Sequence, residues 1–162
     1  MKIIARLLAV PAVTVWLIRR AQCTPYIHIV KDGVTYMERY WLVNPYDNVT
    51  RKTRHSWFPL SLRIHHIMQP DQDRDLHDHP WNARTFILHG WYREVREDGA
   101  LIRRVAGETA RLNFGEYHRI TEVSDGGVWT LFVTGKFRGA WGFKVGGVKV
   151  PFWEYLAKKG NE

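Results

Sequence analysis

From Tyr26 onward, apolar and polar residues alternate with a period of two, and this pattern constrains the fold more than any other feature of the 162-residue chain. A period of two places successive side chains on opposite faces of an extended strand, whereas a helix needs a period near 3.6. Asp-Gly pairs separate the apolar runs, as is typical of hairpin turns. Aromatic residues make up 14% of the chain, and their broad side chains pack well across strands. The sequence therefore favours an all-β fold.

The alternation predicts two hairpins and several further strands. One hairpin joins residues 26–30 to 35–43, and the other joins 85–96 to 100–105, each through a turn that contains Asp-Gly. The other predicted strands are 61–69, 118–123, 128–134 and 148–150. Pro151 then opens a short C-terminal helix. About eight short strands with glycine turns indicate a β-barrel or jelly roll.

The first 21 residues are apolar between basic residues and predict helix rather than strand. The apolar run is shorter than the roughly 20 residues that a membrane-spanning helix needs, and Arg6 and Pro11 interrupt it. We expect residues 1–22 to form a helical segment, broken at Pro11, that packs on a single domain over 23–162. The helical face that is expected to pack consists of Ile3, Ile4, Leu7 and Leu8. Such a helix could also join two chains in a homodimer or lie on an acidic membrane surface.

The formal net charge of +8 invites a nucleic-acid partner, but its distribution argues against one. Lys2, Arg6, Arg19 and Arg20 lie in the first twenty residues, so half of the basic excess belongs to the N-terminal segment. The single cysteine, Cys23, excludes an internal disulfide and a cysteine-based zinc site. These features predict a protein of a reducing compartment, the cytoplasm, whose partner is a small molecule rather than a nucleic acid.

The residues with the clearest chemistry are two histidines separated by one residue. In an extended chain His77 and His79 share a face, with their Cα atoms about 7 Å apart. Two imidazoles at that spacing can converge on an ion held about 2.1 Å from each nitrogen. Asp78 then points to the opposite face. His118 follows a turn at 115–117 and could supply a third ligand.

These residues resemble the motifs of the cupin superfamily. His77-x-His79, followed by Gly90, resembles the first cupin motif, and the run 113–118, which ends at His118, looks like the second. The resemblance covers residues 62–133 and implies a cupin-type β-barrel, also described as a double-stranded β-helix or jelly roll. Further segments are similar to small uncharacterised cupin-like proteins of bacteriophages and bacteria: 71–81, 129–135 and 141–143.

One departure from the cupin pattern changes the expected ligand set. Ala83 stands where a cupin carboxylate ligand is expected, and it cannot bind a metal. The resemblance then implies a metal site of three histidines, His77, His79 and His118. Three neutral histidines suit Fe(II), Zn(II), Ni(II) or Mn(II). Some three-histidine cupins are iron-dependent thiol dioxygenases, so the resemblance implies Fe(II) first.

Three further residues, Arg63, His66 and Tyr117, are candidate catalytic residues. His65 and His66 are adjacent on a strand and must face opposite sides, so one of them is expected to enter the barrel. Arg63 shares a face with His65, and if it points inward it could hold a substrate carboxylate. Tyr117 could line the cavity beside His118 or cap the barrel.

Two functions remain open at this point. One is a metal-dependent enzyme, similar to an iron dioxygenase, that acts on a small polar molecule in the barrel. The other is a non-catalytic module, of phage or bacterial origin, that binds a small ligand or takes part in assembly. Fold alone does not decide between them, because one fold can host unrelated activities.

Overall fold

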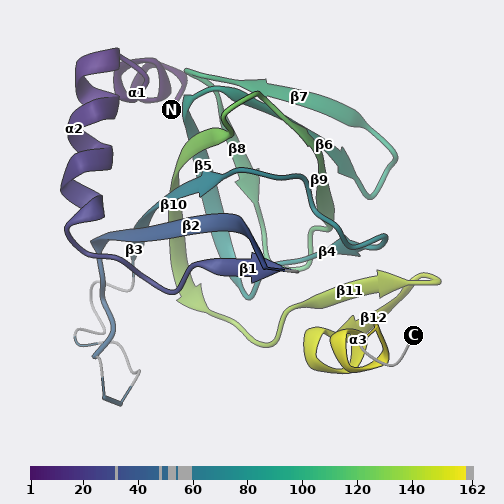
Figure 1. The fold of residues 1–162 in the computed structure, drawn as a ribbon. Helices are drawn as coiled ribbons and strands as arrows, with labels where there is room; N and C mark the ends of the chain where they lie inside the picture. The colour runs from purple at the N-terminus through teal and green to yellow at the C-terminus, as the bar shows by residue number, and fades with distance from the viewer. Residues whose placement is uncertain (32, 48, 51–53, 55–59, 160–162) are drawn as a thin grey trace.

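The computed structural model describes residues 1–31, 33–47, 49–50, 54 and 60–159, so Asp32 in the first predicted turn lies outside it. The described chain is mostly β, with two antiparallel six-stranded sheets and three helices (Figure 1). The strands are β1 (Ile29–Lys31), β2 (Val34–Val43), β3 (Ser61–Ile67), β4 (Leu76–His77), β5 (Trp81–His89), β6 (Trp91–Arg96), β7 (Leu101–Val105), β8 (Thr109–Leu112), β9 (His118–Val123), β10 (Val128–Phe137), β11 (Gly142–Val145) and β12 (Val148–Pro151). The predicted β fold is confirmed, with more strands than expected because β4, β8 and β11 are too short for a clear alternation.

The first sheet has the order β1-β2-β3-β10-β5-β8, and the second has the order β12-β11-β4-β9-β6-β7. On β3, Ile64 faces the helices, whereas Arg63, His65 and Ile67 face the opposite way. Ile67 packs with Ile120 of the second sheet in an apolar cluster between the sheets. Alternation along β3 therefore places the apolar Ile64 against the helices and the polar Arg63 and His65 between the two sheets.

The strand predicted over 85–96 is two strands, and this prediction was wrong. β5 belongs to the first sheet and β6 to the second, with Gly90 between them. Gly90 has a φ of +77°, and a Cβ there would lie 2.5 Å from Ser124 Oγ and 2.7 Å from the carbonyl oxygen of Gly127. Only glycine fits this turn, so the chain crosses from one sheet to the other at this residue.

The N-terminal segment forms two helices, α1 (Lys2–Leu8) and α2 (Pro11–Gln22), and the break predicted at Pro11 is confirmed. They lie against the first sheet, where Ala5, Leu17 and Ala21 are buried (Figure 1). The predicted packing face is partly wrong. Leu8 packs on the core as expected, but Ile3, Ile4 and Leu7 are exposed because α1 contacts β5 through the small side chain of Ala5 instead. No helix in the described part of the chain is long and apolar enough to cross a membrane.

The C-terminal helix α3 (Phe152–Lys159) packs on β11 and β12, as Figure 1 shows. Phe152 stacks on Trp141 with ring centroids 4.8 Å apart, and Tyr155 stacks on Phe143 at 3.9 Å. Trp141 and Phe143 also line a cavity between the sheets. The short helix predicted after Pro151 is confirmed, and it covers one end of that cavity.

Candidate metal centre

A cavity of about 360 Å³, here named the inner cavity, lies between the two sheets. Its volume is in the range of sites that bind small molecules. Side chains from both sheets line it, among them Arg63, His65, His77, His79, His118 and Thr130. The three histidines that were predicted as metal ligands therefore face one cavity, together with His65.

The three predicted ligands converge because two of them are register partners. His77 on β4 pairs directly with His118 on β9, and His79 follows two residues after His77. The Nε2 atoms of His79 and His118 are 2.9 Å apart, and the potential ligand atoms of all three rings lie within 4.8 Å of one another. This spacing fits one ion with a nitrogen ligand from each ring. Within the described ranges, no carboxylate joins this group, in line with Ala83 at the position of the usual cupin ligand.

A buried carboxylate, Glu94 on β6, orients His118. Its Oε2 is 3.1 Å from His118 Nδ1, and its Oε1 accepts hydrogen bonds from Arg96 at 2.9 Å and Arg104 at 3.1 Å. Burial alone would raise the pKa of Glu94, but the hydrogen bond with His118 and the charge of Arg96 lower it to about 2. The ionised carboxylate accepts the Nδ1 proton and leaves the Nε2 lone pair free for a metal.

The protonation states of the other two histidines also suit a metal. Burial lowers the pKa of His77 to about 4, although nearby Asp71 acts in the opposite direction. Burial, together with the neighbouring His118 and His77, lowers the pKa of His79 well below 6.5. Both rings are neutral near pH 7, and a neutral imidazole is the form that binds a divalent ion. The donor set therefore fits a divalent metal site.

Comparison with known proteins gives structural relatives only. No family model matches the chain, and no curated protein matches it. A cupin-2 domain from Rhodospirillum rubrum, Rru_A2000, has 12% identity and a TM-score of 0.51, over 84% of this chain and 80% of that one. A cupin 2 conserved barrel domain protein from Rhodopseudomonas palustris has 13% identity and a TM-score of 0.50, over 86% and 83%. The chain has the cupin fold.

A larger structural relative is the Fe(II) form of HppE. It has 17% identity and a TM-score of 0.51, over 67% of this chain. The matched part is 54% of the HppE chain, so this chain spans little more than half of that relative's length. At these identities the comparisons establish the cupin fold, and the roles of individual residues rest on the geometry of the site.

Within this cupin fold, the structure separates the three candidate catalytic residues. Arg63 is 4% exposed and lines the inner cavity. His66 points away from it: its ring stacks on Trp129 at 4.0 Å, and its Nδ1 is 3.1 Å from Glu38 Oε2. Tyr117 is not among the lining residues either, and Lys144 Nζ lies over its ring at 5.3 Å. His65, the neighbour of His66, is the strand histidine that enters the cavity.

Two acidic residues near the ligands hold the cavity wall. Asp78 is fully buried, accepts a hydrogen bond from the Gly142 backbone N–H at 2.8 Å, and pairs with Lys149 at 2.6 Å. Asp71 accepts hydrogen bonds from the Tyr36 hydroxyl and from the Ile120 backbone N–H. Asp78 therefore faces away from His77 and His79, as the alternation predicted, and Asp71 links the loop before β4 to both sheets.

Sequence reasoning missed Glu94, which is fully buried behind His118. A signal was present, because Glu94 alternates with Tyr92, and both are buried residues of β6. An acidic residue at an inward position of a strand needs a partner of opposite charge or a strong donor. Arg96 lies two residues further along the same strand, but Arg104 and His118 lie on β7 and β9, so only the folded topology identifies these two partners.

Proposed function

We propose that this chain is a metal-dependent enzyme in which His77, His79 and His118 bind one divalent ion, with Fe(II) as the expected metal. The observation that carries the proposal is the convergence of three imidazoles on one point of the inner cavity, one of them held by a buried carboxylate. A divalent ion with open coordination positions acts as a Lewis acid, or, when it is iron, activates oxygen. Fe(II) in HppE, which shares the fold, supports the choice of iron.

The protein's own residues would prepare the site for a small polar substrate. Glu94 holds the Nδ1 proton of His118 and so keeps Nε2 directed at His79. The ring of His65 packs on Phe132 with centroids 5.0 Å apart, and its Nε2 has no hydrogen-bond partner among the described residues. Burial, followed by the charge of Arg63, lowers the pKa of His65 well below 6.5. A neutral His65 can donate a proton to, or accept one from, a polar group of the substrate.

His65 therefore takes the place that sequence reasoning gave to His66, and Arg63 keeps its proposed role as a substrate-binding cation. His66 and Tyr117 have no part in the proposal, because neither lines the inner cavity. Trp141, Phe143 of β11 and Leu156 of α3 line one end of this space. A low-dielectric cavity strengthens the interaction of a charged or polar substrate with these residues.

The metal site is tested by elemental analysis of the purified chain after loading with Fe(II) under anaerobic conditions. We expect about one ion per chain, and less than a tenth of that in His79→Ala. His79 is the ligand to replace because His118→Ala would also remove the partner of Glu94 Oε2. His66→Ala is the matched control, since it removes a histidine of the same region that points outward. Circular dichroism should show the β fold in both variants, and equal metal content in all three proteins would overturn the site.

Turnover is tested separately, by oxygen uptake of the Fe(II)-loaded protein with small thiols, amino acids and sugar derivatives. We expect metal-dependent uptake with at least one class and none with His79→Ala. A chain that binds the ion and a small ligand tightly without turnover would instead be the non-catalytic binding module.

A further inference from the structure

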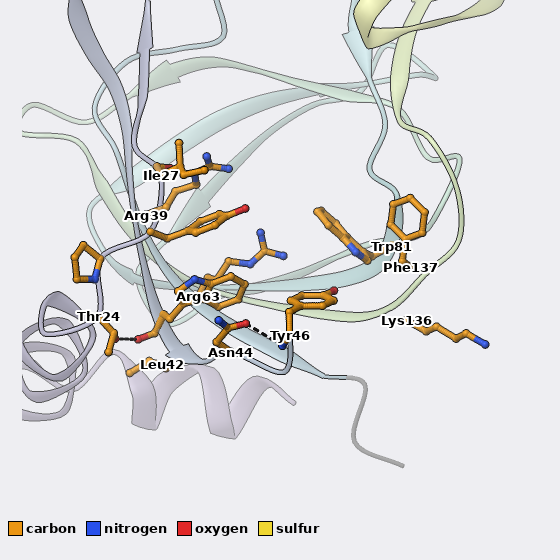
Figure 2. Close-up of a pocket in the computed structure, with 13 residues that line it drawn as sticks. Thr24, Ile27, Arg39, Leu42, Asn44, Tyr46, Arg63, Trp81, Lys136 and Phe137 are labelled. Atoms are coloured by element: carbon orange, nitrogen blue, oxygen red, sulfur yellow. Dashed lines mark hydrogen bonds between the residues drawn. The ribbon is translucent and has the colours of Figure 1, made fainter. Parts of the chain in front are cut away.

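A second and larger cavity, here named the outer cavity, adjoins the inner one. Its volume is about 1420 Å³, and Arg39, Arg63 and Trp81 line both cavities. Figure 2 shows the guanidinium of Arg63 extending among the other lining side chains, with Trp81 and Phe137 across the space from it and Lys136 pointing away at the rim. Arg63 therefore stands where the two cavities meet.

Arg63 is a buried cation without a counterion in the described part of the chain. One of its terminal nitrogens donates to the hydroxyls of Ser61 and Thr134, both at 3.3 Å, and neither hydroxyl carries a charge. The charged side chain that lies close to Arg63 is Arg39, which is also a cation. Burial lowers the pKa of Arg63 to about 10, so it stays protonated near pH 7. A buried charge of this kind is costly unless an anion pairs with it.

Unsatisfied donors gather at the same place. Four buried side-chain polar atoms lack a hydrogen-bond partner among the described residues, and two of them are Arg63 Nε and Trp81 Nε1. A guanidinium and an indole N–H can only donate. A third unpaired atom is His65 Nε2, on the inner-cavity side of Arg63, which donates or accepts according to its tautomer. Buried donors are normally paired, so the junction of the cavities needs an acceptor that the described chain does not supply.

The walls of the outer cavity are aromatic and cationic. The aromatic residues are Tyr26, Trp41, Tyr46, Trp81 and Phe137. The Arg63 guanidinium lies 5.0 Å from the Trp41 ring and 4.8 Å from the Trp81 ring, and Arg39 lies 4.7 Å from the Tyr26 ring. No Asp or Glu is among the described residues that line this cavity. Aromatic walls favour a flat apolar body, and the cations favour a negative group.

We propose that the outer cavity binds a carboxylate with a flat, apolar body, whose carboxylate pairs with Arg63 and whose body lies against the aromatic walls. A carboxylate matches the guanidinium because its two oxygens can accept two parallel N–H bonds. It also offers an acceptor for Trp81 Nε1. This binding site does not require a metal, so it stands whether or not the three histidines bind one.

The experiment is isothermal titration of the full-length, EDTA-treated chain with 4-hydroxyphenylacetate and with its neutral amide. The two probes share a ring and differ in charge. We expect the acid to bind about 30-fold more tightly than the amide, the effect of pairing one buried charge. Arg63→Met should reduce the affinity for the acid to that for the amide. Arg103→Met is the matched control, because Arg103 also lies over a tryptophan, Trp91 at 4.2 Å, but is exposed and lines neither cavity.

Each other result overturns the proposal. These results are equal affinity for acid and amide, no binding of either probe, and undiminished binding of the acid by Arg63→Met. Binding of the acid only after metal loading, unaffected by Arg63→Met, would place the carboxylate on the metal instead. If Arg63→Met does not fold, the comparison of acid and amide in the unaltered chain still decides. Trp81→Phe then serves as a second variant, since it keeps the ring, removes the Nε1 donor and should weaken binding of the acid about fivefold.

Discussion

The molecule buries two charges in opposite circumstances. Glu94, behind the three histidines, is fully buried and surrounded by three groups that donate to it, from Arg96, Arg104 and His118. Arg63, between the two cavities, is 4% exposed, and its hydrogen-bond partners in the described chain are hydroxyl groups, which carry no charge. Both side chains lie on strands and face inward. The difference lies in whether the rest of the fold supplies an opposite charge.

This difference separates a positioning residue from a binding residue. A satisfied buried charge holds its neighbours in fixed orientations, and Glu94 does so for the imidazole of His118. An unsatisfied one remains costly until a ligand pairs with it, which is the situation of Arg63. Substitutions at the two positions should therefore change stability in opposite directions.

The largest expected effect is that of Glu94→Gln. The amide keeps the size of the side chain but has no charge and only one acceptor oxygen. Arg96 and Arg104 lose their anion, and His118 must compete with them for that oxygen. We expect the free energy of unfolding, measured with urea on metal-free protein, to fall by about 3 kcal/mol, the low end for a broken buried network because both arginines can reach water. Metal affinity should fall about 10- to 100-fold.

Glu122→Gln is the control for Glu94→Gln. Glu122 also pairs with an arginine, Arg93 at 2.7 Å, but both side chains are substantially exposed. Its loss should cost less than about 1 kcal/mol. Similar losses for the two variants would show that Glu94 behaves as an ordinary surface ion pair.

The second effect is on the pH dependence of stability and concerns His65. The pKa of His65 is lowered in the folded chain by burial and by Arg63. As pH falls below about 6.5, the unfolded chain takes up a proton at this residue that the folded chain does not, so stability is lost by about 1.4 kcal/mol per pH unit. His65→Gln removes this contribution, and urea unfolding at pH 7, 6 and 5 should give a shallower acid limb. Parallel curves for the two proteins would contradict the burial of a neutral His65.

The smallest effect, and the one opposite in sign to Glu94→Gln, is that of Arg63→Met. Replacement of a buried charge by an apolar side chain of similar length is often neutral or stabilising. We expect the metal-free variant to be as stable as the unaltered chain or about 1 kcal/mol more stable in urea unfolding. A loss above about 2 kcal/mol would mean that Arg63 already has a sufficient partner, and the contrast with Glu94 would then fail.

The sequence predicted the parts of this molecule that depend on local pattern. Alternation located most strands, Pro11 divided the N-terminal helices, and the spacing of His77 and His79 placed two ligands on one side of the chain. The convergence of His118 on them came from a resemblance to a known motif, since strand pairing between β4 and β9 is not a local property. These elements were predictable because each is determined within a few residues or within one recurring motif.

The remainder depended on contacts between distant strands. Alternation shows only that His65 and His66 face opposite sides, so it does not decide which of them takes the inner position. The crossing at Gly90 was missed, since the strand pattern continues on both sides of it, and the clash that requires glycine comes from Ser124 and Gly127. The outer cavity was missed as well, because its walls come from the segment after α2 and from β2, β3, β5 and β10.

The site is divided between the two sheets, and we therefore expect it to select ligands by their length. His77 and His118 belong to β4 and β9 of the second sheet, whereas Arg63 belongs to β3 of the first. The distance from the histidines to the guanidinium is thus set by the spacing of two packed sheets, which changes little because protein interiors are close-packed. A molecule anchored at Arg63 reaches the histidines only if its chain is long enough. In a series of carboxylates that differ by one methylene, we therefore expect a sharp optimum rather than a gradual trend.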